Sequence, residues 1–164
     1  MKEIIPPHIT RQQIAHILHQ VHDPEIPGIS IVDLGMVLDI RQEDSQWLVE
    51  LAPTYSGCPA IDVIPFLTKA MLAENGFPEM DVTMIVAPPW STEWISEEGR
   101  DKLNAWGIAP PSRKNDDEGF GKPDHCPQCQ SASLSLISAY GATPCKAVYR
   151  CDDCQETFDY FKCY

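Results

Sequence analysis

The sequence has little positive charge and no long apolar segment. Its 164 residues hold 12 lysines and arginines against 24 aspartates and glutamates, a formal net charge of −12 at pH 7. This balance argues against a nucleic-acid partner held through its phosphates, because a polyanion needs a positively charged surface. No apolar run approaches the roughly 20 residues of a membrane-spanning helix, and residues 1–10 lack the apolar centre of a signal peptide. We therefore expect a cytoplasmic protein that binds neither nucleic acid nor membrane.

Cysteine is almost absent from the first three quarters of the chain. Cys58 is the one cysteine there, whereas six of the seven lie within residues 126–164. In a chain expected to be cytosolic, such crowding indicates metal rather than disulfides, because this compartment keeps thiols reduced. The odd total also fits poorly with a fully paired disulfide framework.

Charge and composition divide the chain into two parts. Residues 1–109 carry 6 basic and 16 acidic side chains, whereas residues 110–164 carry 6 and 8. Between the two parts, residues 110–123 are rich in proline, glycine and charge, which is typical of a linker. We therefore predict an α/β domain over residues 1–109, a linker over 110–123 and a small cysteine-rich domain over 124–164.

Apolar spacing in the first part predicts alternating helices and strands. Thr10 and Gln13 form a capping box for a first helix. The later elements are predicted as a hairpin of strands over 36–41 and 47–52, a helix over 59–75, a strand over 81–87 parallel to the strand before it, and a helix over 96–106. Pro65 should kink the helix over 59–75 or delay its start.

The strongest motif is a pair of Cys-x-x-Cys knuckles, Cys126–Cys129 and Cys151–Cys154, with 21 residues between them. Four thiolates on two tight turns can surround one tetrahedral ion. The predicted ligand is structural zinc, with iron as the alternative because iron also accepts four thiolates. Short alternating segments between and after the knuckles complete a zinc ribbon. The predicted fold class is therefore α+β, a small two-layer α/β domain with a mixed sheet followed by a C-terminal zinc ribbon.

Two further cysteines of the ribbon, Cys145 and Cys163, stand outside the knuckles. If the strands around the second knuckle form a hairpin, residues whose numbers sum to about 305–308 lie opposite one another, and these two sum to 308. The geometry predicts a second thiol pair. The alternative is that both are reduced and packed as small apolar residues.

Cys58 lies at or next to the N-cap of the helix predicted after it, with Pro59 at the first helical position. Unpaired backbone N–H groups and the helix dipole lower the pKa of a thiol there, so we expect a reactive or metal-binding thiolate. The alternative is a structural cysteine that caps the helix. Upstream, Asp23 and Glu25 place two carboxylates on a loop stiffened by prolines, which can bind metal, engage a partner or simply end a helix.

Three motifs taken together resemble those of a known family. The segments are DPEIP at 23–27, DLGMV at 33–37 and TYSGCP at 54–59, and their order and spacing resemble the small iron-sulfur assembly domain of SufT-like proteins. With APPWS at 87–91 and the terminal ribbon, residues 10–164 resemble the PaaD family, the D proteins of the bacterial phenylacetyl-CoA epoxidase system.

This resemblance implies an accessory role in aerobic phenylacetate catabolism and no enzymatic activity. In that system a di-iron oxygenase epoxidises the ring of phenylacetyl-CoA, and a reductase with flavin and a [2Fe–2S] cluster supplies electrons. A PaaD-like protein is expected to mature or deliver the reductase cluster, with the reductase and oxygenase components as partners. The alternative is a structural docking subunit of the oxygenase that binds no cluster of its own.

The resemblance also assigns roles to residues. It carries cluster binding or transfer to Cys58, with Asp23, Glu25 and Thr54 nearby, and it implies no catalytic residue. Cys145 and Cys163 match cysteines of the family pattern. The expected cofactors are structural zinc and a transient iron-sulfur cluster. One cysteine cannot hold a cluster unaided, so a carrier needs a homodimer or borrowed thiols.

Overall fold

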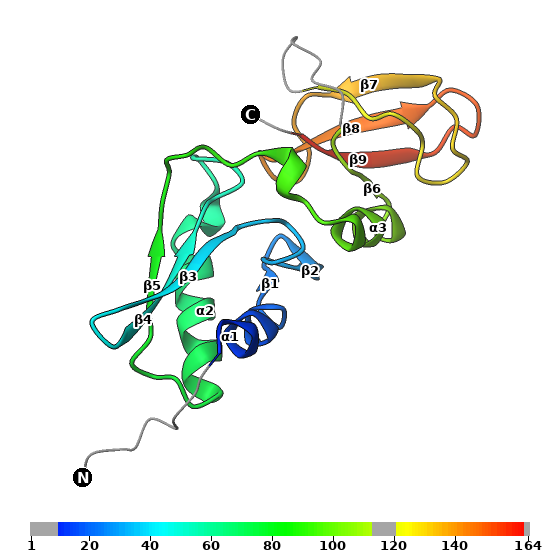
Figure 1. Ribbon diagram of the computed structural model, residues 1–164. Coiled ribbons are helices and arrows are strands. Elements are labelled where there is room, and N and C mark those ends of the chain that lie inside the picture. The colour runs from blue at the N-terminus through cyan, green and yellow to red at the C-terminus, as the bar shows by residue number, and fades with distance from the viewer. Residues whose placement is uncertain (1–9, 113–120, 163–164) are drawn as a thin grey trace.

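The computed structural model describes residues 10–112 and 121–162, which form an α/β domain packed against a smaller β domain (Figure 1). The first domain contains α1 (Arg11–Leu18), β1 (His22–Asp23), β2 (Ile26–Ser30), β3 (Val37–Glu43), β4 (Gln46–Leu51), the 3-10 turn η1 (Pro59–Ile61), α2 (Val63–Glu74), β5 (Asp81–Met84), the 3-10 turn η2 (Thr92–Trp94) and α3 (Glu97–Ala105). The second contains β6 (Ile108–Ala109), β7 (Leu134–Ser138), β8 (Lys146–Cys151) and β9 (Thr157–Phe161).

The first helix begins with the predicted capping box. The Thr10 hydroxyl accepts the backbone N–H of Gln13 at 3.3 Å, and the Gln13 side chain accepts the backbone N–H of Thr10 at 2.9 Å. These reciprocal bonds satisfy two donors that a helix start leaves unpaired. The apolar stripe of α1 is fully buried at Ile14 and Leu18, so the helix is held by packing as well as by its cap.

The sheet of the first domain has the order β3-β4-β5. β3 and β4 form the predicted antiparallel hairpin, which turns at Asp44 and Ser45, both with positive φ. β5 runs parallel to β4 over Leu48–Leu51 and Asp81–Met84, as the helical crossover predicts. α1 and α2 contact each other and the sheet. This is the predicted two-layer arrangement with a mixed sheet.

The helix predicted over 59–75 begins later than expected. Residues Pro59–Ile61 form the separate turn η1, and α2 starts at Val63. Pro65 therefore falls in the first turn of α2, where a missing N–H costs no helical hydrogen bond. Of the two predicted effects of Pro65, the structure shows a delayed start of the helix.

The ribbon sheet has the order β6-β9-β8-β7. β7, β8 and β9 are antiparallel neighbours, as the alternating segments predict. β6 adds a parallel edge strand through Ile108 and Ala109, two residues that directly follow α3 and Gly107. The end of the first domain is thus hydrogen-bonded into the sheet of the second.

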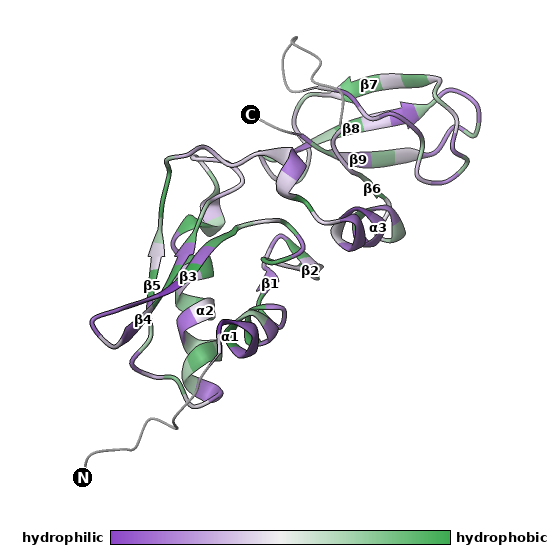
Figure 2. Ribbon diagram, viewed as in Figure 1, coloured by the Kyte–Doolittle hydropathy of each residue, from purple (hydrophilic) through white to green (hydrophobic). Residues whose placement is uncertain are grey.

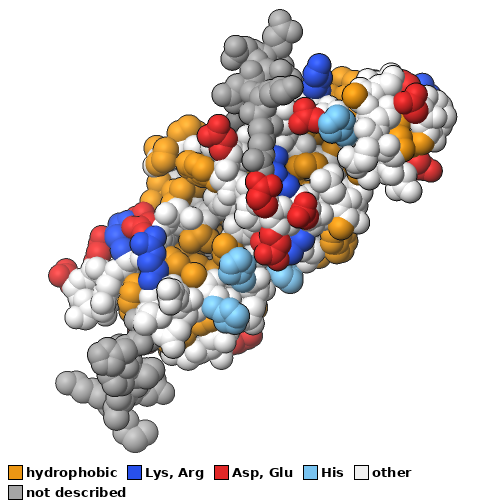
Figure 3. Space-filling view, turned by 45° about the vertical axis from the view of Figure 1, so that its right-hand side comes forward, with side chains coloured by type: hydrophobic (Ala, Val, Ile, Leu, Met, Phe, Trp, Pro, Cys, Tyr) orange, Lys and Arg blue, Asp and Glu red, His pale blue; other side chains and the backbone are white. Residues whose placement is uncertain are grey.

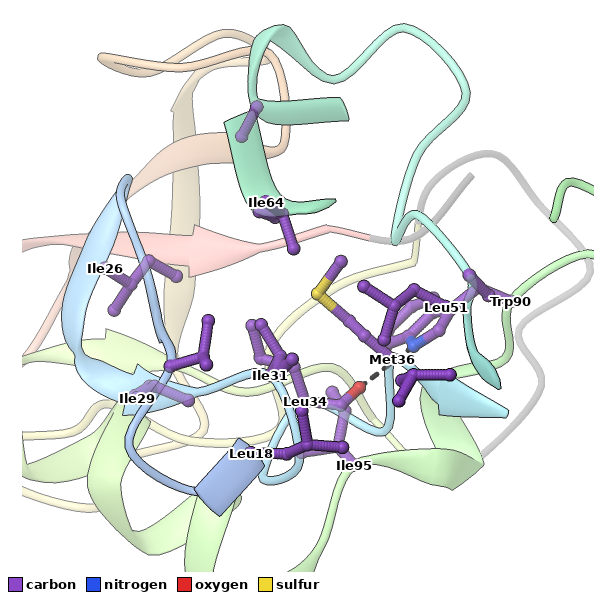
Figure 4. Close-up of a cluster of buried hydrophobic side chains, with 14 of the residues drawn as sticks. Leu18, Ile26, Ile29, Ile31, Leu34, Met36, Leu51, Ile64, Trp90 and Ile95 are labelled. Atoms are coloured by element: carbon purple, nitrogen blue, oxygen red, sulfur yellow. Dashed lines mark hydrogen bonds between the residues drawn. The ribbon is translucent and has the colours of Figure 1, made fainter. Parts of the chain in front are cut away.

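One buried cluster joins the two domains. Phe161 of β9 belongs to the core of the α/β domain, and its ring meets the Trp90 ring edge-on, with centroids 6.2 Å apart and an interplanar angle of 84°. The Trp90 indole also donates to the backbone oxygen of Leu34 at 2.9 Å, and Figure 4 shows this bond within the cluster formed with Ile26 of β2 and Ile64 of α2. The domains therefore share a core.

Two surface elements are hydrophilic. Figure 2 shows the tip of the β3-β4 hairpin and most of α3 in the hydrophilic colour. Within residues 10–112 and 121–162, no helix combines the length and apolar character that crossing a membrane requires.

Candidate functional site

The four knuckle cysteines converge on one point. The sulfur atoms of Cys126 and Cys154 are 3.8 Å apart, those of Cys129 and Cys151 are 3.5 Å apart, and all four lie within 4.8 Å of one another. Zinc–sulfur bonds of about 2.3 Å at tetrahedral angles place sulfur atoms about 3.8 Å apart. The spacing therefore fits one tetrahedral metal ion with four thiolate ligands.

The two knuckles have the same backbone geometry. In the first, the Cys126 N–H donates to the Ser131 oxygen at 2.8 Å, and the Gln130 N–H donates to the Cys126 oxygen at 2.9 Å. The second repeats both bonds within residues 151–156, at 2.9 and 3.0 Å. Gln130 and Gln155 both have positive φ, at 63° and 65°. The backbone thus orients each thiol pair before a ligand binds.

Ionisation of the knuckles is favoured at one position. The backbone N–H of Cys154, with that of Asp153, lowers the pKa of Cys151 to about 7 despite burial. Metal displaces the proton of each thiol that it binds.

Cys58 occupies the predicted position before a helical turn. It is the N-cap of η1, with Pro59 following, and its carbonyl accepts the Ile61 N–H at 3.1 Å. The turn is held on the other side by the Cys58 N–H, which donates to the Tyr55 oxygen at 3.1 Å. The thiol is 8% exposed and belongs to the shared core.

The prediction of a lowered Cys58 pKa is wrong. Burial raises the pKa of the Cys58 thiol, the Ala60 N–H lowers it, and the negative charges of Asp23, Cys145 and Glu25 raise it further. The effect of the helix end is outweighed because the site is desolvated and carries other negative groups. The raised pKa keeps the Cys58 thiol protonated near neutral pH.

The charges of Asp23 and Glu25 act on this thiol. Asp23 is buried, and its carboxylate accepts the backbone N–H groups of Glu25 at 2.7 Å and Ile26 at 3.1 Å. Burial nevertheless raises the pKa of Asp23. The two backbone hydrogen bonds therefore hold the Asp23 carboxylate in one orientation within its loop.

The sequence motif that contains Cys58 meets the motif at 87–91 at one pocket. Residues 53–56 of the loop, including Thr54, line a pocket of about 170 Å³ together with Val86, Pro89 and Trp90. The segments at 54–59 and 87–91, which are separate in the sequence, therefore form one surface. Thr54 contributes to the wall of this pocket.

The DLGMV motif has a structural role in positioning α3. Asp33 is 1% exposed, and its carboxylate accepts the Lys102 ammonium at 2.8 Å and the Ser30 N–H at 3.1 Å. Despite burial, these bonds lower the pKa of Asp33. A Cβ on Gly99 would lie 2.5 Å from the backbone oxygen of Asp33. The glycine therefore permits α3 to approach this turn closely.

The proposed pair of Cys145 and Cys163 stays a prediction, because Cys163 lies outside the described residues. The register of β8 and β9 pairs Lys146 with Phe161, and the Lys162 N–H donates to the Cys145 oxygen at 3.0 Å. Sequence reasoning missed that Cys145 and Cys58 belong to the same buried cluster, because this depends on how the ribbon packs on the first domain.

The fold and these two thiol sites define a class of protein: an iron-sulfur assembly type of α/β domain joined to a four-cysteine ribbon. The family described as "Iron-sulfur cluster assembly protein" matches residues 11–83, and the family described as "PaaD zinc beta ribbon domain" matches residues 110–162. The D component of the "Putative 1,2-phenylacetyl-CoA epoxidase" from Escherichia coli (strain K12) is 41% identical over 98% of this chain and 96% of its own length. The chain belongs to the PaaD family.

Two further similarities concern the α/β domain. A "Fe-S protein maturation auxiliary factor" from Porphyromonas gingivalis is 29% identical over 54% of this chain and 86% of its own length. The crystal structure of the DUF59 domain from Bacillus anthracis superposes with a TM-score of 0.52 at 29% identity, covering 56% of this chain and 89% of that one. The predicted fold class is thereby confirmed, and the four-cysteine site supports metal binding by the ribbon.

Proposed function

We propose that this protein is a non-catalytic, cytoplasmic accessory factor of aerobic phenylacetate catabolism that matures or delivers the [2Fe–2S] cluster of the phenylacetyl-CoA epoxidase reductase. Two relatives support the proposal through their names, one a component of that epoxidase and the other a maturation factor. The match of residues 11–83 to an iron-sulfur assembly family supports the same role.

The observation that carries the proposal is the setting of Cys58. The thiol is nearly buried, lies at the end of a loop held by backbone hydrogen bonds, and is surrounded by negative groups that include Asp23. Iron-sulfur clusters take soft sulfur donors as ligands, and nearby carboxylates stabilise a bound cation. Release remains possible because few protein ligands hold the cargo.

The ribbon has a different task in this proposal. Its four thiolates surround one ion completely, which leaves no open position for chemistry. We assign this site to zinc, which stabilises the ribbon and, through Phe161 and Trp90, supports the core beside Cys58.

The second candidate function is a structural docking subunit without a cluster. It is favoured by the edge strand β7, which leaves apolar side chains at the surface: Leu136, Ile137 and the nearby Tyr140 are 50%, 55% and 71% exposed. Figure 3 shows that apolar side chains also reach the surface on the face drawn there. Such a surface is suited to a protein partner.

Two measurements separate these candidates. The purified full chain is incubated anaerobically with ferrous iron and sulfide, and bound cluster is followed by absorption and Mössbauer spectroscopy. In cells, the iron and sulfide content of the reductase is compared between wild type, Cys58→Ser and a strain without the protein. The maturation role predicts a bound cluster and a cluster-deficient reductase in the variant. A wild-type chain that acquires no cluster, with a normal reductase in Cys58→Ser cells, would favour the docking role.

A further inference from the structure

β7 is an open edge of the ribbon sheet. One side of the strand pairs with β8, and within residues 10–112 and 121–162 no strand pairs with its other side. The Asp152 N–H donates to the Ser133 oxygen at 2.9 Å. Because the backbone groups of an antiparallel strand point alternately to its two sides, those of Leu134 and Leu136 point toward the open edge. The edge therefore offers backbone donors and acceptors to a further strand.

This edge lacks the charges that usually prevent such pairing. Open edge strands of soluble proteins commonly carry lysine or other charged side chains. Residues 126–145 contain no lysine, arginine, aspartate or glutamate, although these make up 22% of the chain. The exposed side chains of β7 are apolar instead, with Leu136 50% and Ile137 55% exposed. β7 is therefore suited to pairing with another strand.

We propose that β7 pairs with β7 of a second copy of the chain, antiparallel about a twofold axis beside Ser135, and that the two ribbons form one continuous sheet. Leu134 of each copy then pairs with Leu136 of the other through the backbone groups that point to the edge. This register uses only residues that precede the irregularity between Leu136 and Ser138.

The same register buries the exposed apolar side chains. Residues directly opposite in an antiparallel pair have their side chains on the same face of the sheet. The half-exposed Leu136 therefore lies beside Leu134 of the other copy, a side chain that packs against the core of its own ribbon. The apolar face of one ribbon thus continues into that of the other.

Charge favours a second copy over an oppositely charged partner. A basic partner is attracted to the α/β domain, where residues 1–109 carry 16 acidic and 6 basic side chains. Residues 110–164 are nearly neutral, with 8 acidic and 6 basic side chains, and the segment that forms the open edge contains none of these. A neutral edge that is complementary to itself allows two copies of one acidic chain to associate.

The position of β7 keeps the acidic domains apart. β6, which directly follows α3, is the opposite edge of the ribbon sheet, and Figure 1 shows the α/β domain on that side. Neighbouring strands are about 4.8 Å apart, so the two β6 strands of the joined sheet are separated by about 34 Å. This distance exceeds the Debye length of about 8 Å at physiological salt. Repulsion between the two α/β domains is therefore largely screened.

Sedimentation velocity of the zinc-loaded full chain tests the association. The disrupting variant is Leu136→Lys, and the matched control is Phe66→Lys, which places the same charge on a 72% exposed residue of α2 in the other domain. Wild type and Phe66→Lys are expected to form a reversible dimer whose dissociation constant does not rise with salt. Leu136→Lys should raise that constant roughly tenfold or more, because it places like charges at the shared edge. Zinc content and circular dichroism establish that each variant is folded.

Hydrogen exchange locates the interface. In wild type, the amides of residues 134–136 should exchange more slowly at high than at low protein concentration, whereas their exchange in Leu136→Lys should not depend on concentration. A wild type that stays monomeric at millimolar concentration would overturn the pairing, as would a dimer that Phe66→Lys disrupts and Leu136→Lys does not. Protection of β7 only after an oxygenase component is added would also overturn it, and would assign the edge to that partner.

Discussion

The contact between Trp90 and Phe161 predicts that the two domains unfold together. The rings meet edge-on with centroids 6.2 Å apart, and both side chains are at most 8% exposed. Such a pair contributes about 0.5–1.5 kcal/mol beyond the burial of its area. A double-mutant cycle with Trp90→Leu, Phe161→Leu and the double variant should therefore yield a coupling energy of about 1 kcal/mol.

A separate variant tests the indole hydrogen bond. Trp90→Phe keeps an aromatic ring but removes the indole N–H that donates to the Leu34 backbone oxygen at 2.9 Å. Loss of a buried hydrogen bond costs about 1–3 kcal/mol, which corresponds to a fall in Tm of roughly 2–12 °C for a chain of this size.

The assay is urea unfolding of the zinc-loaded chain, followed by circular dichroism in both the helix and the aromatic regions. One cooperative transition and a coupling energy near 1 kcal/mol are expected. Two separate transitions, with a coupling energy indistinguishable from zero, would refute the shared core.

The remaining predictions concern the turn that holds α3, and the metal. Lys102→Met should cost about 1–2 kcal/mol, because it removes a charged donor from Asp33 but the ammonium is partly exposed. The fold lowers the pKa of Asp33, so the stabilisation by Lys102 should be present at pH 7 and be lost as pH falls below the ordinary value of 3.8 toward the folded value. Urea unfolding of wild type and Lys102→Met at several pH values measures this loss. An unchanged difference in unfolding free energy between the two proteins at low pH would contradict it. Gly35→Ala should destabilise by more than about 1 kcal/mol in thermal unfolding, because φ is +66° and the new Cβ would lie 2.2 Å from the Trp94 oxygen; a Tm equal to wild type would contradict the turn geometry. Zinc removal by a chelator should unfold the ribbon, because the four thiolates that hold the two knuckles together lose their shared ligand; a ribbon that keeps its circular dichroism without metal would contradict the structural role.

Local hydrogen bonds and short apolar patterns explain which elements the sequence predicts correctly. The capping box at Thr10 and the Ser96 side chain that accepts the Gly99 N–H are encoded within four residues, so the starts of α1 and α3 follow from local sequence. The two knuckles are equally local, and their spacing predicts the four-cysteine site that the structure forms.

Features that depend on packing between distant segments could not be predicted in this way. The parallel strand β6 carries only Ile108 and Ala109, which is too short for a periodic signal. The pKa of Cys58 follows burial and neighbouring charges, neither of which the sequence displays, so a rule based on the helix end alone predicts the wrong direction. The presence of Cys145 and Cys58 in one buried cluster likewise arises from the domain interface.

The central claim is that the protein passes a cluster from the Cys58 site to the reductase. Its most direct test is transfer in vitro, in which cluster-loaded chain is mixed anaerobically with cluster-free reductase and the cluster content of the re-isolated reductase is measured. We expect that wild type fills the reductase faster than equal amounts of free iron and sulfide, and that Cys58→Ser gives no acceleration. Equal rates for wild type, Cys58→Ser and free iron with sulfide would contradict the claim.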